Sequence, residues 1–115
     1  MKMNDLKELE IAKKSLEDHK AIDISVVDVE GFSPFSSYYV LSTATNIRQL
    51  SALSENLEEE FEKNGFTELK KDGIPESGWM IVQAGEVVVH LFLEANRKEI
   101  DLEGLLEKEV TSKRA

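Results

Sequence analysis

The most apolar stretch of the chain, residues 79–93, predicts a β-hairpin. Residues 79–83 form a short apolar run, and residues 86–93 place apolar side chains in both alternating registers. Ala84 and Gly85 suit a tight turn between the two runs, because glycine adopts positive φ at little steric cost. A strand that is apolar on both faces is typical of the centre of a sheet that is covered on both sides. We therefore expect this hairpin to form the middle of an α/β fold.

The residues before the hairpin alternate between helical and strand patterns. Residues 4–20 carry apolar side chains at helical spacing, and Asp5 with Glu8 three residues later resembles a capping box. Residues 21–29 and 37–43 are rich in β-branched and aromatic side chains and predict the first two strands. The turn-rich link between these strands is short, which favours antiparallel pairing.

A change of period after the second strand predicts a second amphipathic helix. Thr45 or Asn46 is suited to capping its start, and leucines followed by Phe61 recur every three or four residues. An Asn-Gly pair ends this helix as a left-handed stop. Residues 66–70 then predict a short strand, which the helical crossover would place parallel to the second strand.

The C-terminal residues predict a last short helix, capped by Asp101, and a tail that frays after about residue 107. With 115 residues, the chain is expected to form a single domain around one core. The predicted fold class is therefore α/β, with a mixed, mostly five-stranded sheet flanked by helices.

Charge and cysteine content narrow the classes of function. The chain has 23 acidic and 14 basic residues, a net charge of -9, which argues against binding nucleic acid through its phosphates and suits a basic protein partner. The absence of cysteine excludes disulfides, cysteine-based zinc sites and thiol catalysis. No apolar run approaches the roughly 20 residues that a membrane span needs, and the N-terminus has no signal-peptide core. We expect a cytoplasmic protein that does not associate with membranes.

The sequence contains no recognisable catalytic motif. A Gly-x-Ser-x-Gly motif, a phosphate-binding glycine-rich loop and a His-Glu-x-x-His motif are all absent, and two histidines are too few for a histidine-rich metal site. We therefore expect a protein that is not an enzyme and that needs no metal or other cofactor.

Two residues of the hairpin do not fit a plain core strand. Trp79 either fills the edge of the core, with its N–H bonded inside the protein, or anchors a protein interface. His90 is more typical of a hydrogen-bonded structural residue than of a ligand. Arg48, at the start of the second helix, is either a surface helix former or a residue that a partner contacts.

Three more side chains are candidates for contacts. Tyr38 and Tyr39 point to opposite faces of the second strand, so that one is expected in the core and the other at a surface. The alternation does not say which of the two is exposed. Arg97 follows the last strand and is expected to pair with a nearby carboxylate such as Asp101 or Glu103.

Four stretches, in a fixed order, resemble the sequence of a known family. They are residues 23–31; residues 37–43 (Ser-Tyr-Tyr-Val-Leu-Ser-Thr) followed by Arg-Gln at 48–49; residues 73–79, which end in Trp79; and residues 85–92 (Gly-Glu-Val-Val-Val-His-Leu-Phe) followed by Arg97 and by Asp-Leu-Glu at 101–103. Their order and spacing are similar to those of the ribosomal silencing factor family, to which the plant Iojap protein is related. The resemblance extends over about residues 6–106.

The resemblance implies a fold similar to the nucleotidyltransferase group, without the catalytic residues of that group. Members of the family bind the large ribosomal subunit at a protein on its subunit-joining face. They block joining of the small subunit and so lower translation when nutrients are scarce, and several members form homodimers. The implied partners are the large subunit and, in a homodimer, a second copy of the chain, with no sequence-specific binding of nucleic acid.

The resemblance also points to a set of partner-binding residues. They are Tyr38, Arg48, Trp79, Met80, Ile81, His90 and Arg97. Trp79 is expected to anchor the interface, and Arg48 and Arg97 to position it through polar contacts. His90 is expected to have a structural role or to lie at the rim.

The sequence departs from the usual residues of the family at several positions, and two other functions are alternatives to the family function. The departures are Ser37, Ala44, Asp72, Gln83, Glu99, Ile100 and Leu106. One alternative is a generic dimeric adaptor without a role on the ribosome. The other is an enzyme of the nucleotidyltransferase type, which needs clustered acids that hold magnesium near a strand end. Asp23 and Asp28 are available for this purpose but form no recognisable pair.

Overall fold

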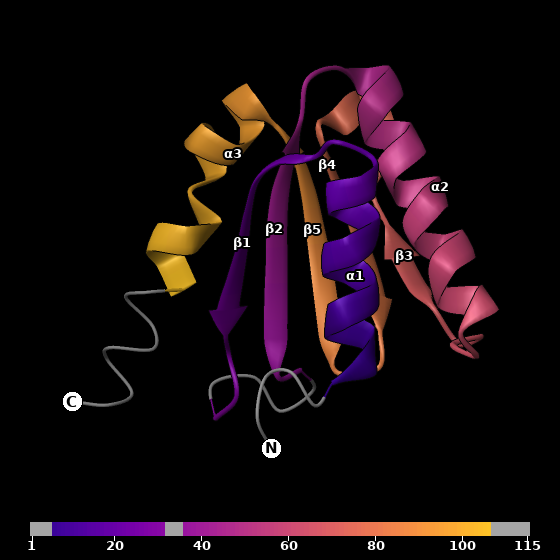
Figure 1. Ribbon diagram of the computed structural model, residues 1–115. Coiled ribbons are helices and arrows are strands. Elements are labelled where there is room, and N and C mark those ends of the chain that lie inside the picture. The colour runs from indigo at the N-terminus through magenta and orange to yellow at the C-terminus, as the bar shows by residue number, and fades with distance from the viewer. Residues whose placement is uncertain (1–5, 32–35, 107–115) are drawn as a thin grey trace.

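A five-stranded mixed sheet forms the centre of the protein, with its strands in the order β1-β2-β5-β4-β3 (Figure 1). The computed structural model describes residues 6–31 and 36–106. The elements along the chain are α1 (Lys7–Asp18), β1 (Ile22–Asp28), β2 (Tyr38–Ala44), α2 (Ile47–Lys63), β3 (Lys70–Asp72), the short 3-10 helix η2 (Pro75–Ser77), β4 (Trp79–Ala84), β5 (Val87–Leu93) and α3 (Glu94–Ile100). Strands β2 and β5 pair in parallel, whereas the β1–β2, β4–β5 and β3–β4 pairs are antiparallel. The predicted mixed α/β sheet is confirmed.

The predicted central hairpin is formed by β4 and β5. Its turn consists of Gly85, with φ of +57°, and Glu86, because pairing of the strands continues as far as Ala84 and Val87. Strand β5 lies between β2 and β4, and every residue of β5 except Leu93 is buried. The strand is therefore enclosed on both edges and both faces, as its apolar pattern predicted.

The short strand predicted for residues 66–70 is wrong. Strand β3 comprises only Lys70–Asp72 and pairs antiparallel with β4, at the edge of the sheet. Phe66 and Leu69 pack against the core instead, and the Phe66 ring lies 6.0 Å from the ring of Phe61. The two apolar residues of this segment therefore serve packing near the end of α2, and β5 takes the position parallel to β2.

Helices α1 and α2 cover one face of the sheet (Figure 1). Their apolar stripes meet alternate residues of β2, β4 and β5 in a buried cluster that includes Leu9, Leu16, Leu50, Leu53, Leu57, Phe61, Val40, Val82, Val89 and Leu91. Helix α3 contacts β5 and β2, and the helical residues 102–106 lie beside β1 (Figure 1). Among the described helices, only α2 and η2 pack closely on β4. The expected helical cover of both faces is therefore incomplete over this strand.

Polar side chains fix the start of α2. Asn46 Oδ1 accepts the backbone N–H of Gln49 at 2.8 Å, which confirms Asn46 as the N-terminal cap. The Gln49 side chain donates to the Lys20 carbonyl at 3.1 Å and accepts the backbone N–H of Thr45 at 2.6 Å. Gln49 thereby fastens α2 to the connection between α1 and β1.

Glu8, the second residue of the capping box predicted for α1, makes a tertiary contact. Asp5 lies outside the described residues, and Leu6 precedes α1 without a side-chain cap. Glu8 is only 8% exposed and accepts the backbone N–H of Glu86 at 3.1 Å. The Glu86 carboxylate in turn accepts the Ser37 hydroxyl at 2.7 Å. These bonds attach α1 and the start of β2 to the turn of the central hairpin.

The last helix begins as predicted. Residues 102–106 are helical, and Asp101 Oδ1 accepts the backbone N–H of Gly104 at 3.2 Å. The fraying predicted after residue 107 falls outside the described residues. No helix in the described part of the chain is long and apolar enough to cross a membrane.

Replacing Asn46 by Ala should lower the free energy of unfolding by about 1 kcal/mol, because the N–H of Gln49 loses its acceptor. Urea denaturation followed by circular dichroism measures the change. Ser51→Ala, in the interior of α2, is the control and should not destabilise the protein, because alanine is the better helix former. Equal effects of the two substitutions would contradict the capping role.

Candidate protein-interaction face

Strand register gathers a set of side chains on the face of the sheet opposite α1 and α2. His90 of β5 pairs with Ile81 of β4 and Leu41 of β2, so these three side chains point to the same side. The same alternation adds Tyr39, Thr43, Trp79, Gln83, Val88 and Phe92. We define the aromatic face as Tyr39, Trp79, Ile81, Gln83, Val88 and His90.

Aromatic rings pack around His90. Its imidazole lies 4.8 Å from the Tyr39 ring, 5.9 Å from the Trp79 ring and 6.2 Å from the Phe92 ring, measured between centroids. Trp79 also stacks on Phe92, with 5.3 Å between the centroids and 24° between the planes. Such pairs contribute beyond the apolar area that they bury. The cluster therefore holds Trp79 in a defined orientation at the start of β4.

A hydrogen bond between Trp79 and His90 determines the state of the imidazole. The indole N–H of Trp79 donates to His90 Nδ1 at 3.1 Å. Because an indole nitrogen only donates, Nδ1 is the acceptor and the neutral ring carries its hydrogen on Nε2. Burial disfavours the charged form and lowers the pKa of His90 to about 4. The imidazole is therefore neutral at neutral pH.

The outer part of the aromatic face is formed by half-buried side chains. Tyr39, Trp79, Ile81 and Gln83 are each partly exposed, whereas Val88 is 7% and His90 5% exposed. None of the six is charged at neutral pH. An uncharged surface with a partly exposed tryptophan and tyrosine is typical of the core of a protein interface.

Three of the seven predicted partner-binding residues meet on this face, namely Trp79, Ile81 and His90. Tyr38 and Met80 lie on the opposite side of the sheet, where each is 7% exposed and packs in the core beneath the helices. Their assignment as contact residues stays a prediction. In the structure they pack in the core, on the side of the sheet opposite the aromatic face.

Arg48 lies apart from this cluster, and Tyr39 joins it. Arg48 is exposed in the first turn of α2, on the helix side of the sheet. Tyr39 pairs with Val88, which puts its ring on the same side as His90. Sequence reasoning found that one of the two tyrosines reaches a surface, but only the strand register shows that it is Tyr39.

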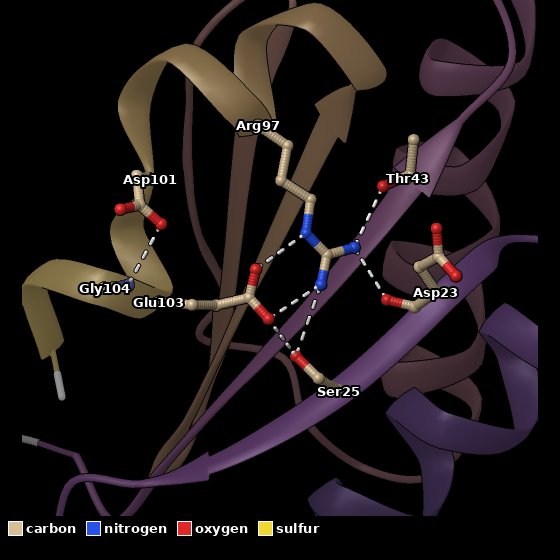
Figure 2. Close-up of polar contacts among 7 residues, drawn as sticks. All are labelled: Asp23, Ser25, Thr43, Arg97, Asp101, Glu103 and Gly104. Atoms are coloured by element: carbon tan, nitrogen blue, oxygen red, sulfur yellow. Dashed lines mark hydrogen bonds and ion pairs between the residues drawn. The ribbon is translucent and has the colours of Figure 1, made fainter.

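Arg97 extends from α3 over β1 and β2 and is held in a polar network (Figure 2). Its guanidinium donates to both Glu103 carboxylate oxygens, at 2.9 Å from Nε and 3.0 Å from Nη2. Nη1 donates to the Thr43 hydroxyl at 2.9 Å and to the Asp23 carbonyl at 2.6 Å. The Ser25 hydroxyl also donates to Glu103, at 3.0 Å. The network ties α3 and the helix after it to the two strands.

Of the two carboxylates predicted as partners of Arg97, the structure selects Glu103. Asp101 caps the following helix instead. The hydrogen bond from Arg97 holds the pKa of Glu103 below its usual value, against the opposing effect of partial burial. Arg97 is 13% exposed and most of its donors are engaged within the protein. Its predicted contact with a partner stays a prediction. Its bonds inside the protein hold α3 and the following helix against β1 and β2, and we call this role the Arg97 clamp.

A hollow of about 310 Å³ lies beside this network, lined by Asp23, Thr43, Glu94, Arg97, Lys98, Asp101 and Glu103. Within the described residues, no group of three or more His, Cys, Asp or Glu side chains is placed to hold a metal ion. Asp23 and Asp28, the acids considered for a magnesium site, stand near opposite ends of β1.

Replacing Arg97 by Ala should lower the free energy of unfolding by about 2 kcal/mol, because charge-assisted bonds to Glu103 are lost together with the contacts to β1 and β2. Thermal and urea unfolding measure the change. Lys98→Ala is the matched control, because the ion pair of Lys98 with Glu94 joins side chains that are 76% and 71% exposed. Exposed ion pairs contribute little to the free energy of unfolding. A similar loss of stability in both variants would therefore contradict the structural role of the Arg97 clamp.

Replacing His90 by Phe should remove a pH dependence of stability. The unfolded chain protonates His90 near its ordinary pKa of 6.5, but the folded protein only near 4. The wild type therefore loses stability as the pH falls through this window, by about 3 kcal/mol from this group at the lower limit. Urea unfolding at several pH values between about 6.5 and 4 should show that the free energy of unfolding of the variant rises relative to that of the wild type as the pH falls. A constant difference between the two proteins would refute the buried neutral imidazole.

The fold and the aromatic face define a small mixed α/β domain with an uncharged surface suited to binding another protein. A crystal structure of a Chromobacterium violaceum protein has the same fold, with a TM-score of 0.83 and 28% identity, covering 93% of this chain and 88% of that chain. The model of the family described as ribosomal silencing factor during starvation matches residues 2–114.

Individual relatives agree with this match. The chain is 32% identical to ribosomal silencing factor RsfS of Bacillus subtilis over 103 residues, which is 90% of this chain and 87% of the relative. It is 32% identical to the Haemophilus influenzae protein of the same name over 97 residues, which is 84% of this chain and 95% of the relative. The chain therefore belongs to the ribosomal silencing factor family, as its motifs predicted. This is not a known family of enzymes.

Proposed function

We propose that this protein binds the large ribosomal subunit through the aromatic face and sterically blocks joining of the small subunit, which represses translation. The contact is with a ribosomal protein on the subunit-joining face, and the protein acts in the cytoplasm. Membership of the ribosomal silencing factor family is the observation that carries this proposal.

The geometry of Trp79 supports a docking role for the aromatic face. The indole is partly exposed, yet it is fixed by its bond to His90 and its stack on Phe92. A side chain that is already ordered loses little conformational entropy on binding, and tryptophan is enriched among interface hot spots. Ile81 and Tyr39, also half-buried, add apolar area that a partner would remove from water.

The distribution of charge favours a basic protein as the partner. The chain carries a net charge of -9, whereas the aromatic face is uncharged. A net negative charge attracts a basic ribosomal protein and disfavours exposed RNA phosphates. An uncharged centre avoids the cost of removing charges from water in the complex.

We assign the contact roles on the placement of the side chains. Trp79 is the anchor, and Tyr39 takes the contact role that the sequence suggested for Tyr38. Gln83, one of the departures from the usual residues of the family, lies on the aromatic face and offers its amide to the partner. Arg48 remains a candidate for a polar contact outside this face.

Replacing Trp79 by Ala should weaken binding to purified large subunits by at least about 1–2 kcal/mol, or roughly 5- to 30-fold, because the anchor is lost. Co-sedimentation near physiological salt measures binding, and addition of small subunits measures the block of joining. Ile47→Ala is the control: this apolar side chain is 44% exposed on α2, on the other side of the sheet, and should be dispensable.

Thermal melting of both variants separates loss of contact from loss of fold. Wild-type binding by a folded Trp79→Ala protein would refute the anchor role. If the wild type stays in the supernatant across a range of salt concentrations, the proposed function fails and a dimeric adaptor becomes the better account. Sedimentation equilibrium of the isolated protein would then test self-association.

A further inference from the structure

One buried polar atom on the aromatic face has no partner in the described protein. His90 Nε2 is buried and makes no hydrogen bond with any described residue. The Trp79 bond to Nδ1 places the hydrogen on Nε2, so the unpartnered group is an N–H donor. A buried donor without an acceptor costs free energy, and such groups are rare in native proteins. The position therefore needs a physical reason.

No described residue around the imidazole supplies such an acceptor. Rings of Tyr39, Trp79 and Phe92 lie around it, and its neighbours across the sheet are Ile81 and Leu41. The other buried side-chain atoms without a partner in the described residues are serine hydroxyls. Their hydrogens rotate to suit a nearby acceptor, whereas the imidazole N–H is fixed in the plane of its ring. Among these unpartnered groups of the described residues, only the His90 N–H therefore points in a fixed direction.

We propose that His90 is a specificity-determining residue of the docking face, whose Nε2–H donates a hydrogen bond to an oxygen of the ribosomal-protein partner. Trp79 is the positioning residue that holds the imidazole in the donor tautomer. This inference rests on the proposed function and deepens it. A partner that presents an oxygen acceptor satisfies the donor, whereas one that presents a donor or an apolar group leaves it unpaired.

Access to Nε2 requires a local movement. Tyr39 has the nearest of the rings around the imidazole and is itself half-buried at the surface. Binding through this donor requires that a neighbouring side chain such as that of Tyr39 rotates and opens the N–H to the partner. Changes of side-chain rotamer are common when interfaces form, even where the backbone stays in place.

Two substitutions at His90 separate the donor role from a packing role. His90→Phe keeps an aromatic ring but removes both nitrogens. It should melt close to the wild type, because removal of the unpaired Nε2–H offsets loss of the bond from the partly exposed Trp79 N–H. It should nevertheless bind large subunits at least about tenfold more weakly. His90→Gln places an amide N–H near the position of Nε2 and should bind within about threefold of the wild type.

A spectroscopic measurement tests the tautomer directly. The chain has only 2 histidines, and His19 Nδ1 lies 2.8 Å from the Ser15 carbonyl and must donate to it. Long-range proton–nitrogen spectra of the free protein should therefore show His90 protonated on Nε2, unlike neutral His19. Trp79→Phe should allow both tautomers of His90. Protonation of wild-type His90 on Nδ1 would overturn the inference.

The binding experiment distinguishes failure of this inference from failure of the proposed function. If Trp79→Ala loses affinity but His90→Phe binds as the wild type does, the donor role is refuted and the proposed function stands. If His90→Gln binds as weakly as His90→Phe, the donor role is also refuted. If the wild type does not bind large subunits at all, both proposals fall together.

Discussion

The pairing of β5 between β2 and β4 is the constraint on which the other features of this protein depend. The strand is hydrogen-bonded along both edges, and its side chains are buried on both faces. Because successive side chains alternate, the backbone that packs Val89 beneath the helices must present His90 on the opposite side. The core and the candidate binding surface are therefore two sides of one strand, and neither can shift in register without the other.

The two sides of that strand differ in polarity. The helix side is an apolar core whose leucines and valines exclude water. The other side includes a tryptophan, a histidine and a buried N–H without a partner among the described residues. A phenylalanine at the position of His90 would satisfy packing alone. Local violations of packing rules tend to occur at functional sites, and this one coincides with the face proposed to contact the ribosome.

Bonds between segments that are distant in the sequence hold the elements around the central hairpin. Glu8 joins α1 to the hairpin turn, Gln49 joins α2 to the connection between α1 and β1, and Arg97 joins α3 to β1. Each uses a charged or amide group to bond a backbone group of a segment distant in the sequence. The apolar core brings the layers together, and these polar bonds fix where the helices end and how they sit on the sheet.

The sequence by itself determined the elements whose signals are local, together with the family. The central hairpin, the Asn46 cap and the antiparallel first strands follow from periodicity and short-range hydrogen bonding. Only the tertiary structure decided that residues 66–69 pack instead of pairing, that Tyr39 shares a face with His90, and that Arg97 binds Glu103. These outcomes depend on strand register and on contacts between segments far apart in the chain, which local patterns do not encode.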